Sequence, residues 1–342
     1  MKIALNMIIK NEEKVLPRLL KSVLPIVNSY YILDTGSTDQ SIKIVKDFFD
    51  SHGISGEIHI NTDCVEIIDG QDCFIYDKAR NEALNLLKGK ADYGFFIDCD
   101  EELVISPDFN LESFKNELSK FDSGSLTMIS AVNYGRMAFF KVDKPFRWVG
   151  KVHEVLVCDE SITKMNINGL SVIVHKDELD NDIEKYKKHS LILQKQVDEY
   201  NIPRDVFYLA NSYRDSGEWE KAVKYYRIRV EMMDGFYEER YYSQFMIGNL
   251  YWGNGKPYQE TLLEFFKCSE LDTMRCEHLF NAIIILQNNN LWQTAYMISK
   301  SCVERFYRKS PYPHRVLFLH EDVYSRRIMD LHNINLKFLG IS

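Results

Sequence analysis

The N-terminal part of the chain alternates between short apolar runs and helical stripes of apolar side chains, and this alternation most limits its possible folds. Ile3 to Ile9 is a nearly continuous apolar run, typical of a strand buried on both faces of a parallel sheet. The helical stripe that follows contains Val15, Leu16, Leu19, Leu20, Val23 and Leu24. Further strands are expected at Tyr30–Leu33, Glu57–Ile60 and Tyr93–Ile97, with helices near residues 42–49 and 78–87. This order predicts βαβ units and a largely parallel sheet.

The pattern changes from about residue 124 onward. Strand-like runs then follow one another without long helices between them, at Ser125–Val132, Met137–Lys141, Val152–Val157 and Leu170–His175. They predict an antiparallel extension that covers one side of the strand ends. Glu101 and Glu102, which come shortly after the strand at Tyr93–Ile97, are expected to begin a loop.

The C-terminal half has the pattern of a helical repeat. After Asp177 the sequence becomes charged and helical, and one stretch has the spacing of a tetratricopeptide unit: Leu209, Ala210, Tyr213, Gly217, Ala222 and Tyr226. Looser copies include Ile247, Gly248, Tyr251, Gly255 and Phe265, and then Ile284, Leu286, Trp292 and Ala295. We therefore predict an α/β domain over residues 1–178 and an all-α repeat domain over residues 179–342. Such repeats bind peptides or proteins, brace a neighbouring domain, or form a homodimer.

Composition excludes several classes of protein. The 342 residues are 45% hydrophobic, which indicates a globular chain. The balance of 42 basic against 50 acidic residues gives a net charge of −8, which argues against a general nucleic-acid binder. Seven cysteines without CxxC spacing favour reduced thiols and a cytoplasmic location. The N-terminus does not resemble a signal peptide, and no stretch approaches the ~20 apolar residues of a membrane span.

The triplet Asp98-Cys99-Asp100 is the strongest indication of a functional site. It follows the apolar run Tyr93–Ile97, so its carboxylates are expected at the carboxyl end of a buried strand. Uncompensated carboxylates are costly there, and a divalent cation that carries phosphate oxygens would compensate them. Open α/β sheets bind their ligands at this edge.

Several motifs in order resemble glycosyltransferase family 2. The matching segments are Met7–Glu13, Leu33–Asp39, Lys78–Asn81, Ile97–Glu102 and Trp148–Glu154. The resemblance covers residues 1–175 and implies the GT-A fold of nucleotide-diphosphosugar transferases. It is closest to the subgroup whose catalytic domain is followed by tetratricopeptide repeats, which includes enzymes that glycosylate bacteriocin peptides.

The resemblance implies a set of residues that bind the nucleotide sugar: Ile8, Lys10, Asn11, Asp34, Arg80, Asp98, Cys99 and Trp148. Asp34 is placed to bind a base or ribose, or it only caps its turn. Thr35 stands where many members have a second aspartate, which weakens the case for uridine. The Arg80 guanidinium suits a diphosphate, with a surface salt bridge as the alternative. Trp148 is either a wall for the sugar or acceptor, or a core indole.

The same resemblance assigns Asp100 to a bound Mn2+ or Mg2+. Asp98 would bind the ribose or reach the metal through water. His153 and His175 are candidate further ligands, and imidazole favours Mn2+, although His175 equally suits a core histidine. Glu154 is the expected base for the acceptor. His153 is the alternative, because alternation along a strand would turn only one of the pair into the site.

These features predict a metal-dependent, inverting glycosyltransferase. Its donor would be a nucleotide-diphosphate sugar, with a UDP-sugar as the first expectation, and its acceptor a peptide, protein or glycan. A nucleotidyltransferase is disfavoured because Ile8–Glu13 lacks the Gly-rich, basic loop that holds a triphosphate. An inactive transferase-like domain on a repeat scaffold, acting as a binding protein, is the other alternative.

Overall fold

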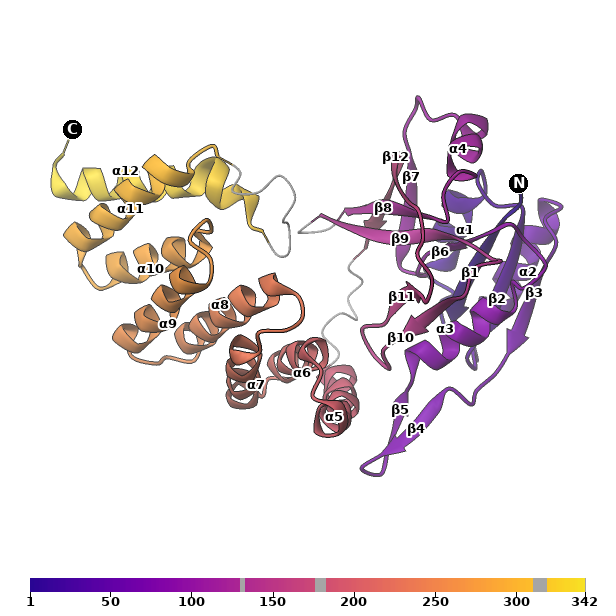
Figure 1. Ribbon diagram of the computed structural model, residues 1–342, viewed down its shortest axis with the longest axis horizontal. Helices are drawn as coiled ribbons and strands as arrows, with labels where there is room; N and C mark the ends of the chain where they lie inside the picture. Colours follow the sequence, from indigo (N-terminus) through magenta and orange to yellow (C-terminus); the bar gives the residue numbers. More distant parts are fainter. Residues whose placement is uncertain (130–132, 176–182, 310–318, 342) are drawn as a thin grey trace. The chain divides into compact units, whose positions relative to one another are not determined.

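The computed structural model describes residues 1–129, 133–175, 183–309 and 319–341. The chain divides into two compact units, Met1–Asp182 and Ile183–Ser342 (Figure 1). The predicted boundary between residues 178 and 179 lies outside the described residues.

The first unit is built on an eight-stranded sheet with the order β3-β2-β1-β6-β9-β8-β12-β7. The strands are β1 (Ile3–Ile9), β2 (Ser29–Asp34), β3 (Gly56–Ile60), β6 (Tyr93–Phe96), β7 (Glu101–Ile105), β8 (Ser123–Ile129), β9 (Tyr134–Lys141) and β12 (Lys164–Val174). From β3 to β6 all neighbours are parallel, whereas β9 is antiparallel to both β6 and β8. Beyond them β12 is parallel to β8 and antiparallel to β7. The predicted mixed-sheet α/β class is therefore confirmed.

Helices and two small hairpins accompany the sheet. They are α1 (Leu16–Val23), α2 (Ser41–Ser51), α3 (Tyr76–Asn85), α4 (Leu111–Leu118), β4 (Val65–Ile68) with β5 (Gln71–Phe74), and β10 (Phe146–Val149) with β11 (Val155–Cys158). The helix α1 buries Leu16, Leu19, Leu20 and Val23, which belong to the stripe predicted from the sequence. The helix α4 and the hairpin of β4 and β5 were not predicted.

Strand β1 is buried on both faces, which explains its continuous apolar run. Ile3, Leu5 and Met7 belong to the larger core cluster, whereas Ala4 packs into a separate cluster with Phe96. Asn6 is the polar exception in this strand. Its Nδ2 donates to the carbonyl oxygens of Tyr31 at 3.0 Å and Ala83 at 2.8 Å, so it ties β1 to β2 and α3.

Two local expectations were wrong. Glu101 and Glu102 begin strand β7, not a loop, because they pair with Val174 and Ile173 of β12. The strand expected at Val152–Val157 starts only at Val155. A turn precedes it, with positive φ at Gly150 (108°) and His153 (54°). Residues 130–132 of the strand expected at Ser125–Val132 lie outside the described residues.

The second unit is helical, as predicted. Its elements are α5 (Ile183–Tyr200), α6 (Pro203–Asp215), α7 (Trp219–Glu231), α8 (Tyr237–Gly253), α9 (Tyr258–Leu271), α10 (Glu277–Asn288), α11 (Trp292–Phe306), the short π-helix η2 (Val323–Arg327) and α12 (Ile328–Leu339). Close packing of α8 on α9 depends on Gly248, where an added Cβ would lie 2.6 Å from the Phe265 ring. Within the described residues, no helix is both long and apolar enough to cross a membrane.

Candidate functional site

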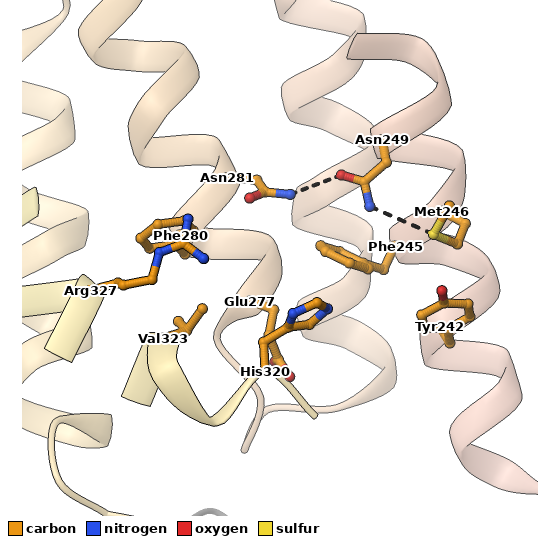
Figure 2. Close-up of a pocket in the computed structure, with 10 residues that line it drawn as sticks. All are labelled: Tyr242, Phe245, Met246, Asn249, Glu277, Phe280, Asn281, His320, Val323 and Arg327. Carbon is orange, nitrogen blue, oxygen red and sulfur yellow. Dashed lines mark hydrogen bonds between the residues drawn. The ribbon is translucent and has the colours of Figure 1, made fainter. Parts of the chain in front are cut away.

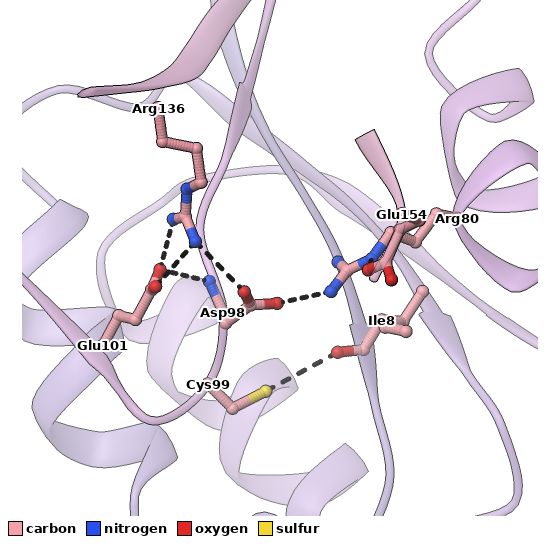
Figure 3. A network of polar contacts seen from close by, with 7 residues as sticks. All are labelled: Ile8, Arg80, Asp98, Cys99, Glu101, Arg136 and Glu154. Atoms are coloured by element: carbon pink, nitrogen blue, oxygen red, sulfur yellow. Dashed lines mark hydrogen bonds and ion pairs between the residues drawn. The ribbon is translucent and has the colours of Figure 1, made fainter. Parts of the chain in front are cut away.

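The sheet has a topological switch point at β1. The chain leaves β1 for β2 on one side, and β6 later joins β1 on the other side. Ligands of open α/β sheets bind outside the carboxyl ends of the strands at such a point. The ends of β1 and β6 are also linked directly, because the Cys99 thiol donates to the Ile8 carbonyl oxygen at 3.6 Å (Figure 3). Cys99 itself is buried in the core.

Asp34 ends β2 with a fully buried side chain. Its Oδ1 accepts hydrogen bonds from the backbone N–H groups of Gly36 at 3.0 Å and Ser37 at 2.9 Å, so Asp34 does cap its turn. Its other oxygen, Oδ2, is buried and has no hydrogen-bond partner among the described residues. A buried acceptor without a donor is costly, so Oδ2 is suited to a ligand hydroxyl, a ligand N–H or a water.

The loop after β1 is joined to the loop after β2. Asn11 has a φ of 57°, a left-handed conformation that asparagine tolerates. Its Oδ1 accepts a hydrogen bond from the N–H of Thr38 at 2.8 Å, and its own N–H donates to Ser37 Oγ at 3.0 Å. Lys10, beside it, is exposed, and Ile8 is half-buried. The predicted nucleotide-binding segment therefore has a braced backbone.

Asp98 is held by two arginines (Figure 3). Arg80, from α3, donates through Nη2 to Asp98 Oδ1 at 2.8 Å. Arg136, from β9, donates through Nη1 to Asp98 Oδ2 at 3.3 Å. Burial alone would raise the pKa of Asp98, but the charges of Arg80 and Arg136 outweigh it and lower this pKa. Asp98 is therefore kept as a carboxylate.

The ion pairs continue on both sides of Asp98. Arg80 Nε donates to Glu154 Oε1, and Arg136 Nη1 donates to Glu101 Oε1 at 2.7 Å. The resulting charge chain is Glu154–Arg80–Asp98–Arg136–Glu101. Burial and the charge of Asp98 raise the pKa of Glu101, against the opposing effect of Arg136. Burial would lower the pKa of Arg80, but its carboxylate neighbours outweigh it and raise this pKa.

Trp148 and Asn81 connect the small hairpin to α3. Trp148 is 6% exposed, and its ring lies edge-on to Phe96 with centroids 4.7 Å apart. Asn81 Nδ2 donates to the Trp148 carbonyl at 2.9 Å, and the Trp148 N–H donates to Asn81 Oδ1 at 2.8 Å. The indole is thus buried, and strand β10 is fastened to the helix that carries Arg80. His153 lies in the turn after β10, directly before Glu154.

Asp100 and His175 are neighbours through the backbone. The His175 N–H donates to the Asp100 carbonyl at 3.2 Å, and Arg18 Nη2 also lies 3.2 Å from that oxygen. The His175 ring points to Glu102, with Nε2 2.8 Å from Glu102 Oε2. A ligating histidine commonly has such a carboxylate on its other ring nitrogen.

The described side chains supply only part of the ligand set that a divalent cation needs. Within the described ranges, no group of three or more His, Cys, Asp or Glu side chains could hold a metal ion. Both oxygens of Asp98 already bind guanidinium groups. Asp100 and His175 therefore suit only a cation that takes most of its ligands from substrate phosphates and water, which is usual for Mg2+.

Sequence reasoning missed Arg136 and the role of Glu101. The available signal was a charged residue inside the strand Tyr134–Lys141, because a buried charge requires a partner. The identity of that partner depends on which strands become neighbours, and no local pattern gives it.

The helical unit contains a cavity of about 290 Å3 between α8, α10 and the segment around η2 (Figure 2). Its walls combine rings and amides, from Tyr242, Phe245, Asn249, Phe280, Asn281 and His320. Asn281 Nδ2 donates to Asn249 Oδ1 at 2.8 Å. The remaining Asn249 contact is weak, because its Nδ2 faces the Met246 sulfur at 3.7 Å. The two amides thus pair with each other at the cavity wall.

Comparison with known proteins matches residues 6–159 to the model of the family "Glycosyl transferase family 2". A TPR repeat-containing protein of Synechococcus elongatus is 27% identical over 146 residues, which cover 42% of this chain and 31% of that protein. The chain thus spans about a third of the length of this curated relative.

Solved structures with similarity to part of the chain include MamA and a kinesin light chain with TPR-like repeats. One MamA structure is 10% identical, covering 49% of this chain and 88% of MamA, with a TM-score of 0.35. A kinesin light chain of Podosopora anserina with TPR-like repeats is 16% identical, covering 46% of this chain and 78% of that chain, with a TM-score of 0.33. TM-scores at this level do not establish a shared fold.

Proposed function

Since residues 6–159 form a glycosyltransferase family 2 domain, we propose that the chain transfers a sugar from a nucleotide-diphosphate sugar to an acceptor. The observation that carries this proposal is the position of Asp98-Cys99-Asp100. The triplet follows the strand β6 after Ile97, and β6 is the parallel neighbour of β1 at the switch point of the sheet. A UDP-sugar is the first donor to test.

The donor would lie along the ends of β1 and β2. The buried, unpartnered Oδ2 of Asp34 would accept a hydrogen bond from the base or ribose. The braced backbone of Ile8 to Asn11 would line the nucleotide, and Lys10 offers an exposed ammonium group for the phosphates. Arg80 pairs with its two carboxylates through Nε and Nη2, and its buried Nη1 has no hydrogen-bond partner among the described residues, so Nη1 is the nitrogen left for the diphosphate.

A Mn2+ or Mg2+ ion would be held by Asp100, with His175 as the candidate second ligand. Their backbone contact supports this pairing, and Glu102 would orient the imidazole. When bound, the ion would neutralise the charge that develops on the leaving diphosphate. The remaining ligands would come from the donor and from water.

Glu154 would take the proton of the acceptor nucleophile. Arg80 occupies its Oε1, so Oε2 is the oxygen left for that proton. His153 is the alternative base, since it lies in the same turn. A base opposite the leaving group would give a single displacement with inversion at the sugar.

The helical unit would bind the acceptor, which is a peptide, protein or glycan. The cavity between α8 and α10 supports this, because its walls combine aromatic rings with the amide pair of Asn249 and Asn281. Residues of both chemical types are what an acceptor of mixed polarity requires.

A transferase-like domain without activity, serving a binding scaffold, is the second candidate. Its support is that arginines already occupy both oxygens of Asp98, and that the described residues contain no group of three metal-ligating side chains. Such a protein would bind an acceptor without turning over a donor.

A thermal-shift panel of nucleoside diphosphates and their sugars, with and without Mn2+, tests the proposal. A ligand of the folded state at ~100 Kd adds roughly 2.7 kcal/mol of stability. A Mn2+-dependent shift with one nucleotide, followed by transfer to an acceptor with an inverted anomeric centre by NMR, is the expected result. No shift with any nucleotide would favour the scaffold.

A further inference from the structure

The first unit contains a second pocket, which lies away from the proposed donor site. It has a volume of about 450 Å3 and is formed by the second half of α3, the end of β9 and the beginning of β10 (Figure 1). Lys141, in its wall, pairs with Tyr93, the first residue of β6, whereas Asp98 comes after the other end of that strand. The pocket therefore lies toward the opposite edge of the sheet from the triplet.

The apolar part of the lining is largely buried. Phe140 and Phe146 are both buried, and their ring centroids lie 5.7 Å apart. Leu84 of α3 and Val142 pack against the same core cluster, and Pro145 adds to this surface. Apolar and aromatic side chains of this kind are what the ring or the short alkyl chain of a small ligand contacts.

One wall carries hydrogen-bond donors that the protein does not use. Asn85 and Lys88 line the pocket, and both are exposed. Within the ranges that the structure describes, neither side chain has an ion-pair or hydrogen-bond partner. The N–H of Lys88 donates to the Asn85 carbonyl oxygen at 3.3 Å, and residues three apart in such a turn have their side chains on the same side. An ammonium group and an amide are thus available together for an anionic group.

The other wall adds cations whose partners are largely solvated. The ion pairs there are Lys141 with Asp122 at 3.3 Å, Lys144 with Glu160 at 3.1 Å, and Arg147 with Asp159 at 2.8 Å. The side chains of Glu160 and Asp159 are 55% and 56% exposed. Exposed ion pairs contribute little to stability, so a ligand anion can share these cations at small cost. The charged lining comprises four cations and one carboxylate, in a chain whose net charge is −8.

We propose that this pocket binds a small organic anion with an apolar body, of the class of aromatic or aliphatic carboxylates and phosphate esters. Lys88 and Asn85 would hold the anionic group, and the rings of Phe140 and Phe146 would contact the apolar body. A pocket of about 450 Å3 has the size of a small-molecule site. No residue assigned to the donor, the cation or the acceptor base lines it, so the inference does not rest on the proposed function.

Two dyes with the same rings test this proposal in the full chain. 8-Anilinonaphthalene-1-sulfonate is an anion, N-phenyl-1-naphthylamine is its uncharged counterpart, and both fluoresce in apolar surroundings. Lys88→Gln removes the unpaired ammonium group, so it should weaken the affinity for the sulfonate by about fivefold to tenfold. The same variant should change the affinity for the neutral dye by less than about twofold. Lys46→Gln, at an exposed lysine of α2, is the matched control and should change neither affinity.

A second variant establishes that the dyes bind in this pocket. Asn85→Trp introduces an indole at its wall from an exposed position, so it should abolish the binding of both dyes there without unfolding the unit. Asn116→Trp adds the same ring at an exposed position of α4 and should leave both affinities unchanged. Phenyl phosphate and benzoate should displace the sulfonate from the wild-type protein, whereas benzyl alcohol should not. The tighter of the two anions identifies the anionic group that the pocket prefers.

Four results would overturn the inference. They are no binding of the sulfonate by the wild-type protein, equal effects of Lys88→Gln on the two dyes, unchanged binding in Asn85→Trp, and no displacement by either anion. None of these measurements uses a sugar nucleotide. A protein that binds no nucleotide would therefore contradict the proposed function and leave this inference standing.

Discussion

Nη2 of Arg80 lies 2.8 Å from Oδ1 of Asp98, and the Nε of the same guanidinium donates to Glu154. One buried cation thus joins the carboxylate proposed for the donor to the carboxylate proposed as the base. A substitution of Arg80 must therefore change the surroundings of both Asp98 and Glu154.

Arg80→Met should destabilise the first unit by roughly 3–5 kcal/mol, because it removes a buried cation and leaves two partly buried carboxylates, Asp98 and Glu154, without their partner. The free energy of unfolding from urea titration measures this. Arg147→Met removes an exposed pair with Asp159 and should cost at most about 1 kcal/mol. Equal losses in the two variants would mean that Arg80 is not a structural centre of the charge chain.

Asp100→Ala should abolish the Mn2+-dependent part of nucleotide binding, since Asp100 is the proposed anchor of the cation. The unfolding free energy should change by less than about 1 kcal/mol. Thermal shift with and without Mn2+ checks both expectations. Asp143→Ala, an exposed aspartate on the same unit, serves as the control. Full Mn2+-dependent affinity in Asp100→Ala would move the cation to other ligands.

Glu154→Gln should keep donor binding and lose sugar transfer, because the amide still accepts from Arg80 but takes no proton at neutral pH. Single-turnover assays with saturating donor separate the two effects. Normal turnover in this variant would transfer the role of base to His153, and His153→Gln would then be the variant to lose activity.

His278 should make the helical unit sensitive to acid. Burial lowers the pKa of His278 to about 4, although Glu277 opposes this shift. The unfolded chain, with a pKa near ~6.5, therefore takes up the proton first, and stability falls as pH drops from about 6.5 toward 4, by about 3 kcal/mol. Urea midpoints between pH 8 and pH 4 should fall less steeply for His278→Gln. Parallel curves for the two proteins would contradict the assignment.

Gly248→Ala should destabilise the helical unit by roughly 1–3 kcal/mol, because the new Cβ would meet the Phe265 ring at 2.6 Å. Gly253 lies in the same helix, and a Cβ there meets nothing within 4 Å. Gly253→Ala should therefore be neutral or stabilising, by up to about 1 kcal/mol. Thermal unfolding of the pair measures the difference, and similar losses in both would show that packing on Phe265 is not the cause.

The fold was predictable where local patterns determine it. The apolar run of β1 needs two buried faces, and the spacing of Gly248 and Phe265 reflects a close approach of two helices. The position of Asp98 and Asp100 after β6 followed from the same reasoning.

The charge chain could not be predicted, because Arg136 finds Asp98 and Glu101 only once β9 has taken its place beside β6. Strand β7 does not show as a strand in the sequence, because its opening glutamates give no apolar alternation. These glutamates pair with β12, whose paired residues lie more than sixty residues further along the chain.

The two hydrogen bonds between the Asn81 side chain and the Trp148 backbone have a mechanical consequence. They make β10 a lateral extension of α3, so the indole and the Arg80 guanidinium belong to one rigid block. A motion that shifts one of them must carry the other. If Glu154 moves when a substrate binds, the backbone must therefore change in the turn between Gly150 and His153, where both named residues have positive φ.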